Sequence, residues 1–207
     1  MRLALVSIGA SALLLGVLAL ALAGRGPSGA PVGVGAGPFR GSEAPARIRM
    51  PAFSLHDVDG AVVSSNGLIG KVVILTFLDT RCKEACPIIA GQLASTAALL
   101  TTEERSQVAF VAITSDPRVD DPTAVRAFLE RHRALGTVHY LSGRTPTLRR
   151  LYRSFQILST LESGDADTHS APVRIYSRDG VWLATQHAGA DLTPTNLAHD
   201  IRVALRR

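Results

Sequence analysis

The stretch KVVILTFLDTRCKEACPIIAGQL, residues 71–93, contains the pattern on which the fold of this chain depends. Its first part, residues 72–78, is a short apolar run rich in β-branched residues, bounded by Gly70 and Asp79. Such a run is typical of a strand buried on both faces in the middle of an α/β sheet. We therefore predict a central strand over residues 72–78.

The second part of this stretch has the spacing of a helix that begins near Cys86. Pro87 lies in the first turn, where proline is well tolerated. Apolar residues then recur at helical spacing, at Ile89, Leu93, Ala97 and Leu100. Cys82 and Cys86, the only two cysteines of the chain, thus flank a strand-to-helix turn. Because the N-terminus of a helix stabilises thiolates, the pattern predicts reactive sulfur at this turn.

Two closely spaced cysteines provide no disulfide framework for a fold, and a bond between them would remove little chain entropy. Their spacing fits redox or metal chemistry. The alternatives are a small structural disulfide or two inert buried thiols. The peroxiredoxin motif does not fit, because Thr80 is one residue too close to Cys82 and Thr76 stands where that motif requires proline.

The bulk composition indicates one globular domain with accessory segments. The chain has 207 residues, of which 46% are hydrophobic and 19% charged, and its net charge is +5. The basic residues are dispersed rather than gathered into a block, and aromatic residues make up only 5%. These features argue against a nucleic-acid partner and indicate a solvated, arginine-rich surface.

The N-terminus carries an export signal. Residues 3–23 contain no charged side chain and are long enough to span a bilayer as a helix. The run ends in Ala21-Leu22-Ala23, which resembles a signal-peptidase site. We expect residues 1–23 to be either a signal peptide or a transmembrane anchor. Both alternatives place the rest of the chain outside the cytoplasm.

Residues 24–38 are dominated by Gly, Pro and Ala and predict a flexible tether. Residues 39–207 form the predicted domain, in which strands alternate with helices before a closing hairpin and helix. This order indicates an α/β fold with a mixed sheet. The expected elements after the tether are a hairpin over 53–63, strands at 72–78, 108–114 and 138–141, helices from Cys86, Pro122, Pro146 and Pro194, and a hairpin over 173–184.

Three features together resemble the Sco (SCO1/SenC) family of copper-handling proteins, within the thioredoxin superfamily. The first is FLDTRCKEACP, residues 77–87, which matches the family's strand and its C-x-x-x-C-P. The second is His169 in the sequence DTHS, just before a strand that ends in Asp179-Gly180. The third is the order of membrane segment, tether and domain. The resemblance covers about residues 39–207.

The resemblance implies a thioredoxin-like fold, a central mixed sheet flanked by helices, with an N-terminal membrane segment. It also implies that Cys82, Cys86 and His169 bind copper. Two thiolates and one imidazole are a soft donor set that suits Cu(I) and accepts Cu(II), whereas a structural zinc site would lack a fourth ligand. By the same resemblance, the protein delivers copper to the binuclear copper site of cytochrome c oxidase, or reduces the cysteines of that site. It would face the periplasm from the cell membrane, or be secreted.

Two positions depart from the family pattern. The family often has proline and then an acidic residue after the first cysteine, where this chain has Lys83 and Glu84. Pro172 stands where thioredoxin-like reductases carry a cis-proline beside their cysteines, which Sco proteins usually lack. We therefore predict a cis Ala171–Pro172 bond that shapes a docking surface for a partner. This feature favours thiol exchange.

Two further functions are compatible with the residues. In an exported thiol-disulfide oxidoreductase, Cys82, predicted to be the more exposed cysteine, would attack a partner disulfide and Cys86 would resolve the mixed disulfide. In a structural interaction domain, the two cysteines would form an incidental disulfide. The sequence leaves open whether the protein is an enzyme.

Overall fold

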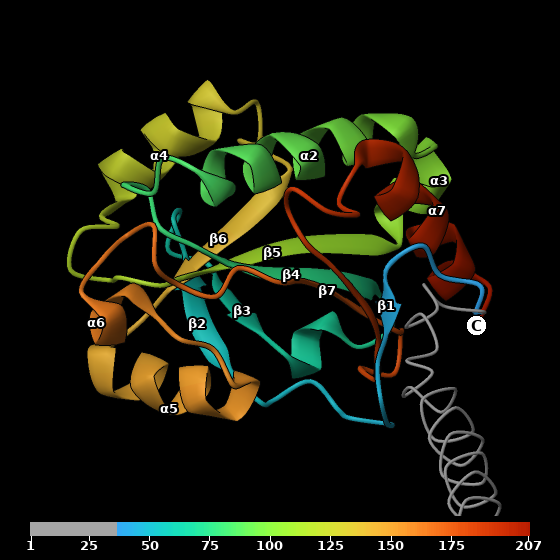
Figure 1. Cartoon of the computed structure of the whole chain (residues 1–207), viewed down its shortest axis with the longest axis horizontal. Helices are drawn as coiled ribbons and strands as arrows, with labels where there is room; N and C mark the ends of the chain where they lie inside the picture. The colour runs from blue at the N-terminus through green and yellow to red at the C-terminus, as the bar shows by residue number, and fades with distance from the viewer. Residues whose placement is uncertain (1–36) are drawn as a thin grey trace, which may run out of the picture. The chain divides into compact units, whose positions relative to one another are not determined.

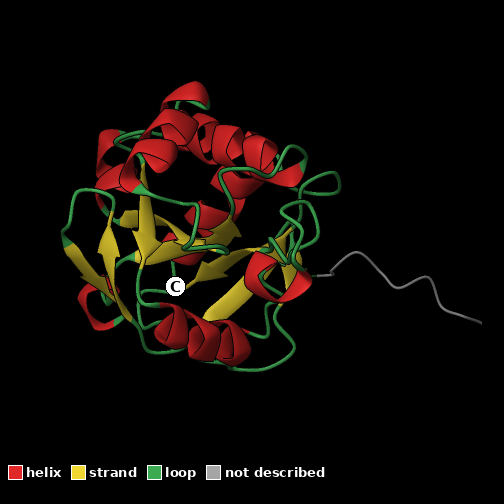
Figure 2. Ribbon diagram, turned by 90° about the vertical axis from the view of Figure 1, so that its left-hand side faces the viewer, coloured by secondary structure: helices red, strands yellow, loops and turns green. Residues whose placement is uncertain are grey.

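The computed structural model describes residues 37–207, so the predicted membrane segment and nearly all of the tether lie outside the described residues. The described part has three layers (Figure 1). Helices α2 (Ala85–Leu99), α4 (Pro122–Arg131) and α7 (Pro194–Leu205) cover one face of a sheet. Helix α5 (Thr145–Phe155) covers the other face, as Figure 2 also shows. The predicted α/β architecture with flanking helices is therefore confirmed.

The sheet of the described part has eight strands and is mixed. Strands β4, β5 and β6 are parallel to one another, and the remaining neighbours pair antiparallel. Every residue of β4 and β5 is buried, because both strands lie in the interior of the sheet between two helical layers. The order across the sheet is β1 (Ser42–Glu43), β8 (Trp182–Gln186), β7 (Val173–Tyr176), β4 (Val72–Leu78), β5 (Val108–Thr114), β6 (Val138–Ser142), β2 (Ser54–Asp57) and β3 (Val62–Ser64).

The sheet divides the hydrophobic core in two. Alternate residues of a strand point to opposite faces, so Ile74 and Leu78 of β4 pack under α2 and α7, while Leu75 and Phe77 pack over α5. On the α5 side the ring of Phe77 meets that of Phe155 edge to face, with centroids 5.3 Å apart. Because both faces are covered, the β4 sequence is apolar throughout instead of alternating.

The predicted helix starts have the capping expected from their sequences. The side chain of Asp121 accepts hydrogen bonds from the backbone N–H groups of Thr123 and Ala124 at the start of α4. Three short helices were not predicted from the sequence, because none is long enough to show a helical period. They are η1 (Asn66–Leu68), α3 (Thr102–Ser106) and α6 (Thr160–Ser163).

Both predicted hairpins form. The first, β2 with β3, turns at Gly60, whose φ of 84° favours glycine. It pairs with β6 at one edge of the sheet, where Asp57 Oδ2 lies 2.7 Å from His139 Nδ1. The second, β7 with β8, lies beside β4 and leads from the loop that carries His169.

One buried carboxylate ties the beginning of the domain to its last helix. Asp200 of α7 accepts hydrogen bonds from the backbone N–H groups of Arg40 at 2.7 Å and Gly41 at 3.0 Å. It also accepts one from Gln186 Nε2 at 2.7 Å. These bonds hold the first described residues against β8. Among residues 37–207, no helix combines the length and apolar character that a membrane span requires.

Replacement of Asp200 by alanine is expected to lower the free energy of unfolding by about 2–4 kcal/mol, because two backbone N–H groups and one amide would lose their acceptor. Urea denaturation followed by circular dichroism measures this change. Asp59→Ala is the matched control, since its side chain is 72% exposed and its ion pair with Arg126 contributes under about 1 kcal/mol. An equal loss in the free energy of unfolding for the two variants would contradict the assigned role of Asp200.

Candidate metal centre

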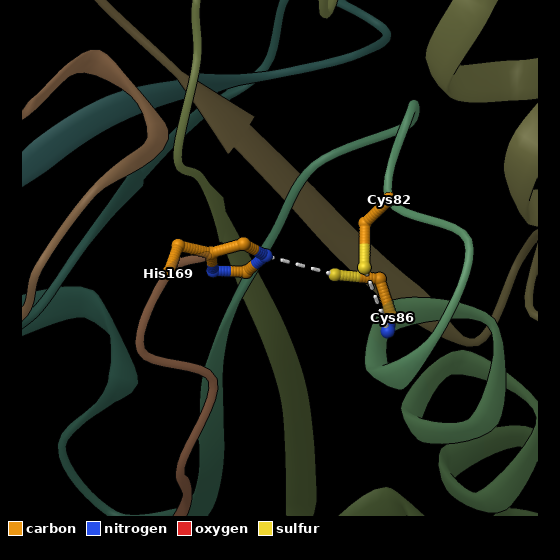
Figure 3. A group of neighbouring side chains, drawn as sticks. All are labelled: Cys82, Cys86 and His169. Carbon is orange, nitrogen blue, oxygen red and sulfur yellow. Dashed lines mark hydrogen bonds between the residues drawn. The ribbon is translucent and has the colours of Figure 1, made fainter. Parts of the chain in front are cut away.

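The three residues predicted to bind metal come from two loops that meet at one end of the sheet. Strand β4 ends at Leu78, Cys82 lies in the loop that follows, and Cys86 lies in the first turn of α2. His169 arrives from the loop between α6 and β7. In Figure 3 the imidazole points at the sulfur of Cys86, with the sulfur of Cys82 beside it. The structure therefore brings together all three residues.

The donor atoms of this group converge closely. Cys86 Sγ lies 3.2 Å from His169 Nε2, and Cys82 Sγ accepts a hydrogen bond of 3.3 Å from the backbone N–H of Cys86. All three donor atoms lie within 4.8 Å of one another. Both cysteines are free thiols. Cys82 is the more exposed of the two, as predicted, but only by a small margin, at 5% against 0%.

The two sulfur atoms are electrostatically unequal. Hydrogen bonding from the Cys86 side chain, opposed by burial and assisted by His169 and by backbone N–H groups, lowers the pKa of Cys82 to about 5. The hydrogen bond to Cys82, together with burial, raises the pKa of Cys86 well above its ordinary value. At neutral pH the pair therefore consists of one thiolate and one thiol that donates to it.

The imidazole of His169 is oriented for ligation. Its Nδ1 lies 3.2 Å from the carbonyl oxygen of Ser170, so that nitrogen donates its proton and Nε2 faces the sulfur atoms. Burial disfavours the charged ring, but hydrogen bonding to Cys82 and to the Ser170 carbonyl outweighs burial and raises the pKa of His169. The neutral tautomer leaves the Nε2 lone pair directed at the place where a metal would bind.

Two buried carboxylates fix the loop that carries Cys82. Asp120 accepts hydrogen bonds from the backbone N–H of Thr80 at 3.0 Å and from its hydroxyl at 2.7 Å. Asp116 accepts one of 2.9 Å from Arg81 Nη2. Neither Asp116 nor Asp120 was assigned to the site from the sequence, and neither forms a hydrogen bond with the cysteines. The pattern DPRVD, residues 116–120, directly after β5 was the signal available for both.

A further bond joins the cysteine loop to the histidine loop. The backbone N–H of Lys83 donates to Asp167 Oδ1 at 2.7 Å, two residues before His169. The side chains of Lys83 and Glu84 are exposed. Lys83 thus joins the two loops through its backbone N–H. This bond was not predicted from the sequence.

The prediction for Pro172 is wrong. The Ala171–Pro172 bond is trans, and residues 37–207 contain no cis peptide bond. Ser170 explains why no cis bond is required: its N–H donates to the carbonyl of Leu158 at 2.8 Å, and its hydroxyl accepts from the Leu158 N–H at 3.1 Å. These two hydrogen bonds position the chain before β7 with a trans Ala171–Pro172 bond, the isomer that X–Pro bonds prefer. His169 lies beside the cysteines.

The donor set fits copper. Two sulfur atoms and one imidazole nitrogen suit Cu(I), and the set lacks the fourth ligand of a structural zinc site. Among residues 37–207, this is the one group of three or more Cys, His, Asp or Glu residues with donor atoms close enough to hold a metal ion. Both sulfur atoms are buried and the imidazole is half-buried.

Comparison with known sequences gives one family. The sequence model of the SCO1/SenC family matches residues 41–206. A Stutzerimonas stutzeri protein, provisionally named a copper-binding protein, is 30% identical over 135 residues, which are 63% of this chain and 65% of that protein. The aligned part is thus just under two thirds of that relative. An SCO2-like protein of Rickettsia conorii is 23% identical over 158 residues, covering 72% of this chain and 74% of its own length.

Solved structures agree on the fold. ScoI of Bradyrhizobium japonicum, with copper bound, has a TM-score of 0.65 at 22% identity, covering 76% of this chain and 99% of its own. The thioredoxin domain of a Bacteroides vulgatus thiol-disulfide oxidoreductase has a TM-score of 0.57 at 16% identity, covering 77% of this chain and 98% of its own. At these identities the likeness shows the fold alone, and it confirms the thioredoxin-like architecture.

The reduced chain is expected to retain one thiolate down to acid pH. Because the pKa of Cys82 is lowered, its thiolate absorbance in the ultraviolet should persist through neutral pH and disappear as the pH falls through about 5. In Cys86→Ala, which lacks the thiol donor, the same transition should move toward the ordinary cysteine pKa of about 8.5. A transition that is the same in both proteins would contradict the pairing of the two sulfur atoms.

Proposed function

Because the chain belongs to the SCO1/SenC family, we propose that it is a copper-binding metallochaperone whose ligands are Cys82, Cys86 and His169. The observation that carries this proposal is the convergence of the three donor atoms within 4.8 Å at a buried site. The provisional name of the Stutzerimonas relative, and the copper bound to the Bradyrhizobium protein, support copper as the cargo.

The protonation states determine how copper would bind. Cys82 is already a thiolate at neutral pH and meets the incoming ion first. Cys86 must then lose its proton, because only the thiolate is a ligand. His169 already holds its proton on Nδ1 and needs no rearrangement to offer Nε2. Above the pKa of His169, binding of one Cu(I) should therefore release about one proton rather than two.

The proposed partner is the copper-site subunit of cytochrome c oxidase. BsSco, whose structure resembles this chain with a TM-score of 0.65 at 20% identity over 78% of this chain and 96% of its own, is described as a member of the Sco family of cytochrome c oxidase assembly proteins. A three-ligand site suits transfer, because an incoming ligand can bind the copper before a ligand of this chain leaves. The chain could equally reduce the partner's cysteines before loading.

A specific observation favours a second function, thiol-disulfide oxidoreductase. The lowered pKa of Cys82 and the raised pKa of Cys86 are the asymmetry expected of an attacking and a resolving cysteine. The Cys82 thiolate would attack a partner disulfide and release one partner sulfur. Cys86 would then give up its proton and attack Cys82 of the mixed disulfide, leaving a Cys82–Cys86 disulfide and a reduced partner.

We further propose that residues 1–23 place the domain outside the cytoplasm, either as an uncleaved anchor or as a cleaved signal. The uncharged run of residues 3–23 and the Gly/Pro-rich tether of residues 24–38 support this proposal. In the anchored case the domain would face the periplasm while attached to the cell membrane.

The copper proposal is tested by titrating the reduced chain with Cu(I) against a competing chelator. Wild type should bind one equivalent. His169→Ala should weaken binding by at least about 100-fold, since even residues that only orient ligands contribute about 10–100-fold. The Cys82→Ser/Cys86→Ser double variant should not bind. His56→Ala is the matched control, because His56 is exposed and lies far along the chain from the site.

Weak binding that does not depend on His169 would reject the metallochaperone. In that event the reduction potential of the cysteine pair becomes the next measurement. A reductase that tolerates His169→Ala would support the second function, because the imidazole is a ligand in the first and only a neighbour of the sulfur atoms in the second.

Export is tested with a reporter enzyme that is active only outside the cytoplasm, fused after Arg207. The fusion should be active, and deletion of residues 1–23 should abolish its activity without reducing the amount of protein. Mass spectrometry of the purified chain then distinguishes the two alternatives, since cleavage would remove a segment ending near Ala23. Activity that survives the deletion would contradict the proposal.

A further inference from the structure

A pocket of about 430 Å³ opens beside the metal centre. Its wall includes His169 and Ala85, the residue before Cys86, so an occupant would lie against two elements of the copper site. The opposite wall comes from the exit of β8, with His187 and Ala188. The full lining is Ala85, Gln156, Ile157, His169, Ser170, Ala171, Pro172, Arg174, His187 and Ala188.

Arg174 supplies the permanent charge of this pocket. Its guanidinium lies over the ring of Trp182, with Cζ 4.7 Å from the ring centroid, and 6.0 Å from that of Phe155. The indole is itself fixed, because its N–H donates to the carbonyl of Ala184 at 3.0 Å. The guanidinium is therefore held in one position by aromatic packing.

The hydrogen-bonding capacity of Arg174 is incompletely used. Its Nε is buried and has no acceptor among the described residues. Within residues 37–207, no carboxylate lies at ion-pair distance from it, whereas Arg81, Arg118, Arg126 and Arg202 each pair with an acid. A guanidinium that lines a pocket and has no carboxylate partner among the described residues keeps its charge available for a ligand in that pocket.

The charge of the lining favours an acid as that ligand. Two histidines and Arg174 line the pocket, and none of its described lining residues is Asp or Glu. Arginine presents its N–H groups as a planar fork that matches a carboxylate. The rest of the wall is mixed: Ile157 and Pro172 contribute apolar surface that can pack against the stem of a side chain, and Gln156 and Ser170 contribute polar surface.

We propose that the Arg174 pocket, defined by the lining above, receives an Asp or Glu side chain of the protein that exchanges copper with this chain. The proposal rests on the copper function proposed above and specifies the chemistry of the partner. A carboxylate seated on Arg174 would hold the partner's copper ligands near His169 and Cys86. Docking and ligand exchange would then be adjacent events, one at Arg174 and the other at the sulfur atoms.

The test uses the chain's only tryptophan, Trp182, as a reporter, because its ring packs against the guanidinium of Arg174. Two short capped peptides with the same sequence each contain a C-x-x-C pair. They differ at one position beside this pair, which is Glu in one peptide and Gln in the other. With the peptide cysteines alkylated and the full-length chain free of copper, the Glu peptide should perturb Trp182 fluorescence and bind about tenfold more tightly than the Gln peptide. The preference should weaken as salt is added.

Variants assign this preference to one side chain. Arg174→Gln should bind both peptides equally, and Arg174→Lys should keep part of the preference, since it keeps the charge but not the fork. Arg105→Gln is the matched control, because Arg105 is an exposed arginine of α3 at the other end of β5. Thermal unfolding of each variant identifies any loss of the fold. If Arg174→Gln does not fold, the proposal is tested instead by the binding preference of Arg174→Lys and by the salt dependence of the wild type.

Several results would overturn the proposal. One is equal binding of the two peptides to wild type, and another is a preference that survives Arg174→Gln. Binding of free glutarate as tightly as the Glu peptide would instead identify a site for small carboxylates. Because docking is measured without copper, the docking proposal and the copper proposal are tested separately. Tight Cu(I) binding with no preference for the Glu peptide would reject only the docking site.

Discussion

The site depends on one negative charge shared by two buried sulfur atoms at the start of α2. Such a charge is stable away from water only where donors surround it. Here the donors are the thiol of Cys86 and the N–H groups of the first helical turn, and the imidazole of His169 donates to the sulfur atoms only when it is protonated. Each donor must be held within hydrogen-bond distance of the sulfur atoms. This requirement explains why several hydrogen bonds fix the surrounding loops.

Carboxylates provide those attachments, and all of them except the exposed Asp167 are buried. Asp120 and Asp116 attach the Cys82 loop to the end of β5, and Asp167 attaches it to the loop of His169. Asp200 does the same at the other end of the domain, between the first described residues and α7. A carboxylate accepts several N–H bonds at once, so each aspartate joins segments that are far apart in the sequence. None of these residues needs to touch a metal to affect the site.

The fold was predictable where the sequence pattern is local. The apolar run of residues 72–78, the cap at Asp121 and the prolines at helix starts each identify an element from its immediate neighbours. His169 was found only through its resemblance to a family, because nothing local distinguishes it from other loop histidines. Asp120, Asp200 and Arg174 escaped prediction because their roles come from partners distant in the chain. The isomer of the Ala171–Pro172 bond was mispredicted for a related reason. It depends on the contacts of Ser170 and not on the thioredoxin-like position of Pro172 in the sequence.

Acquisition and release of copper would place opposite demands on the same three residues, and the inequality of the two cysteines is compatible with both. A thiolate at Cys82 would bind the ion without any prior loss of a proton. Because the pKa of Cys86 is raised, its sulfur would regain a proton once a competing ligand displaced it, and this would favour release. A site of two low-pKa thiolates would bind more tightly but would release more slowly. The same inequality also suits disulfide exchange, because an attacking thiolate and a protonated resolving thiol are the starting state of that reaction. His169 distinguishes the two functions physically, because its Nε2 would add a third donor to copper but would not be needed for the exchange of electrons between sulfur atoms.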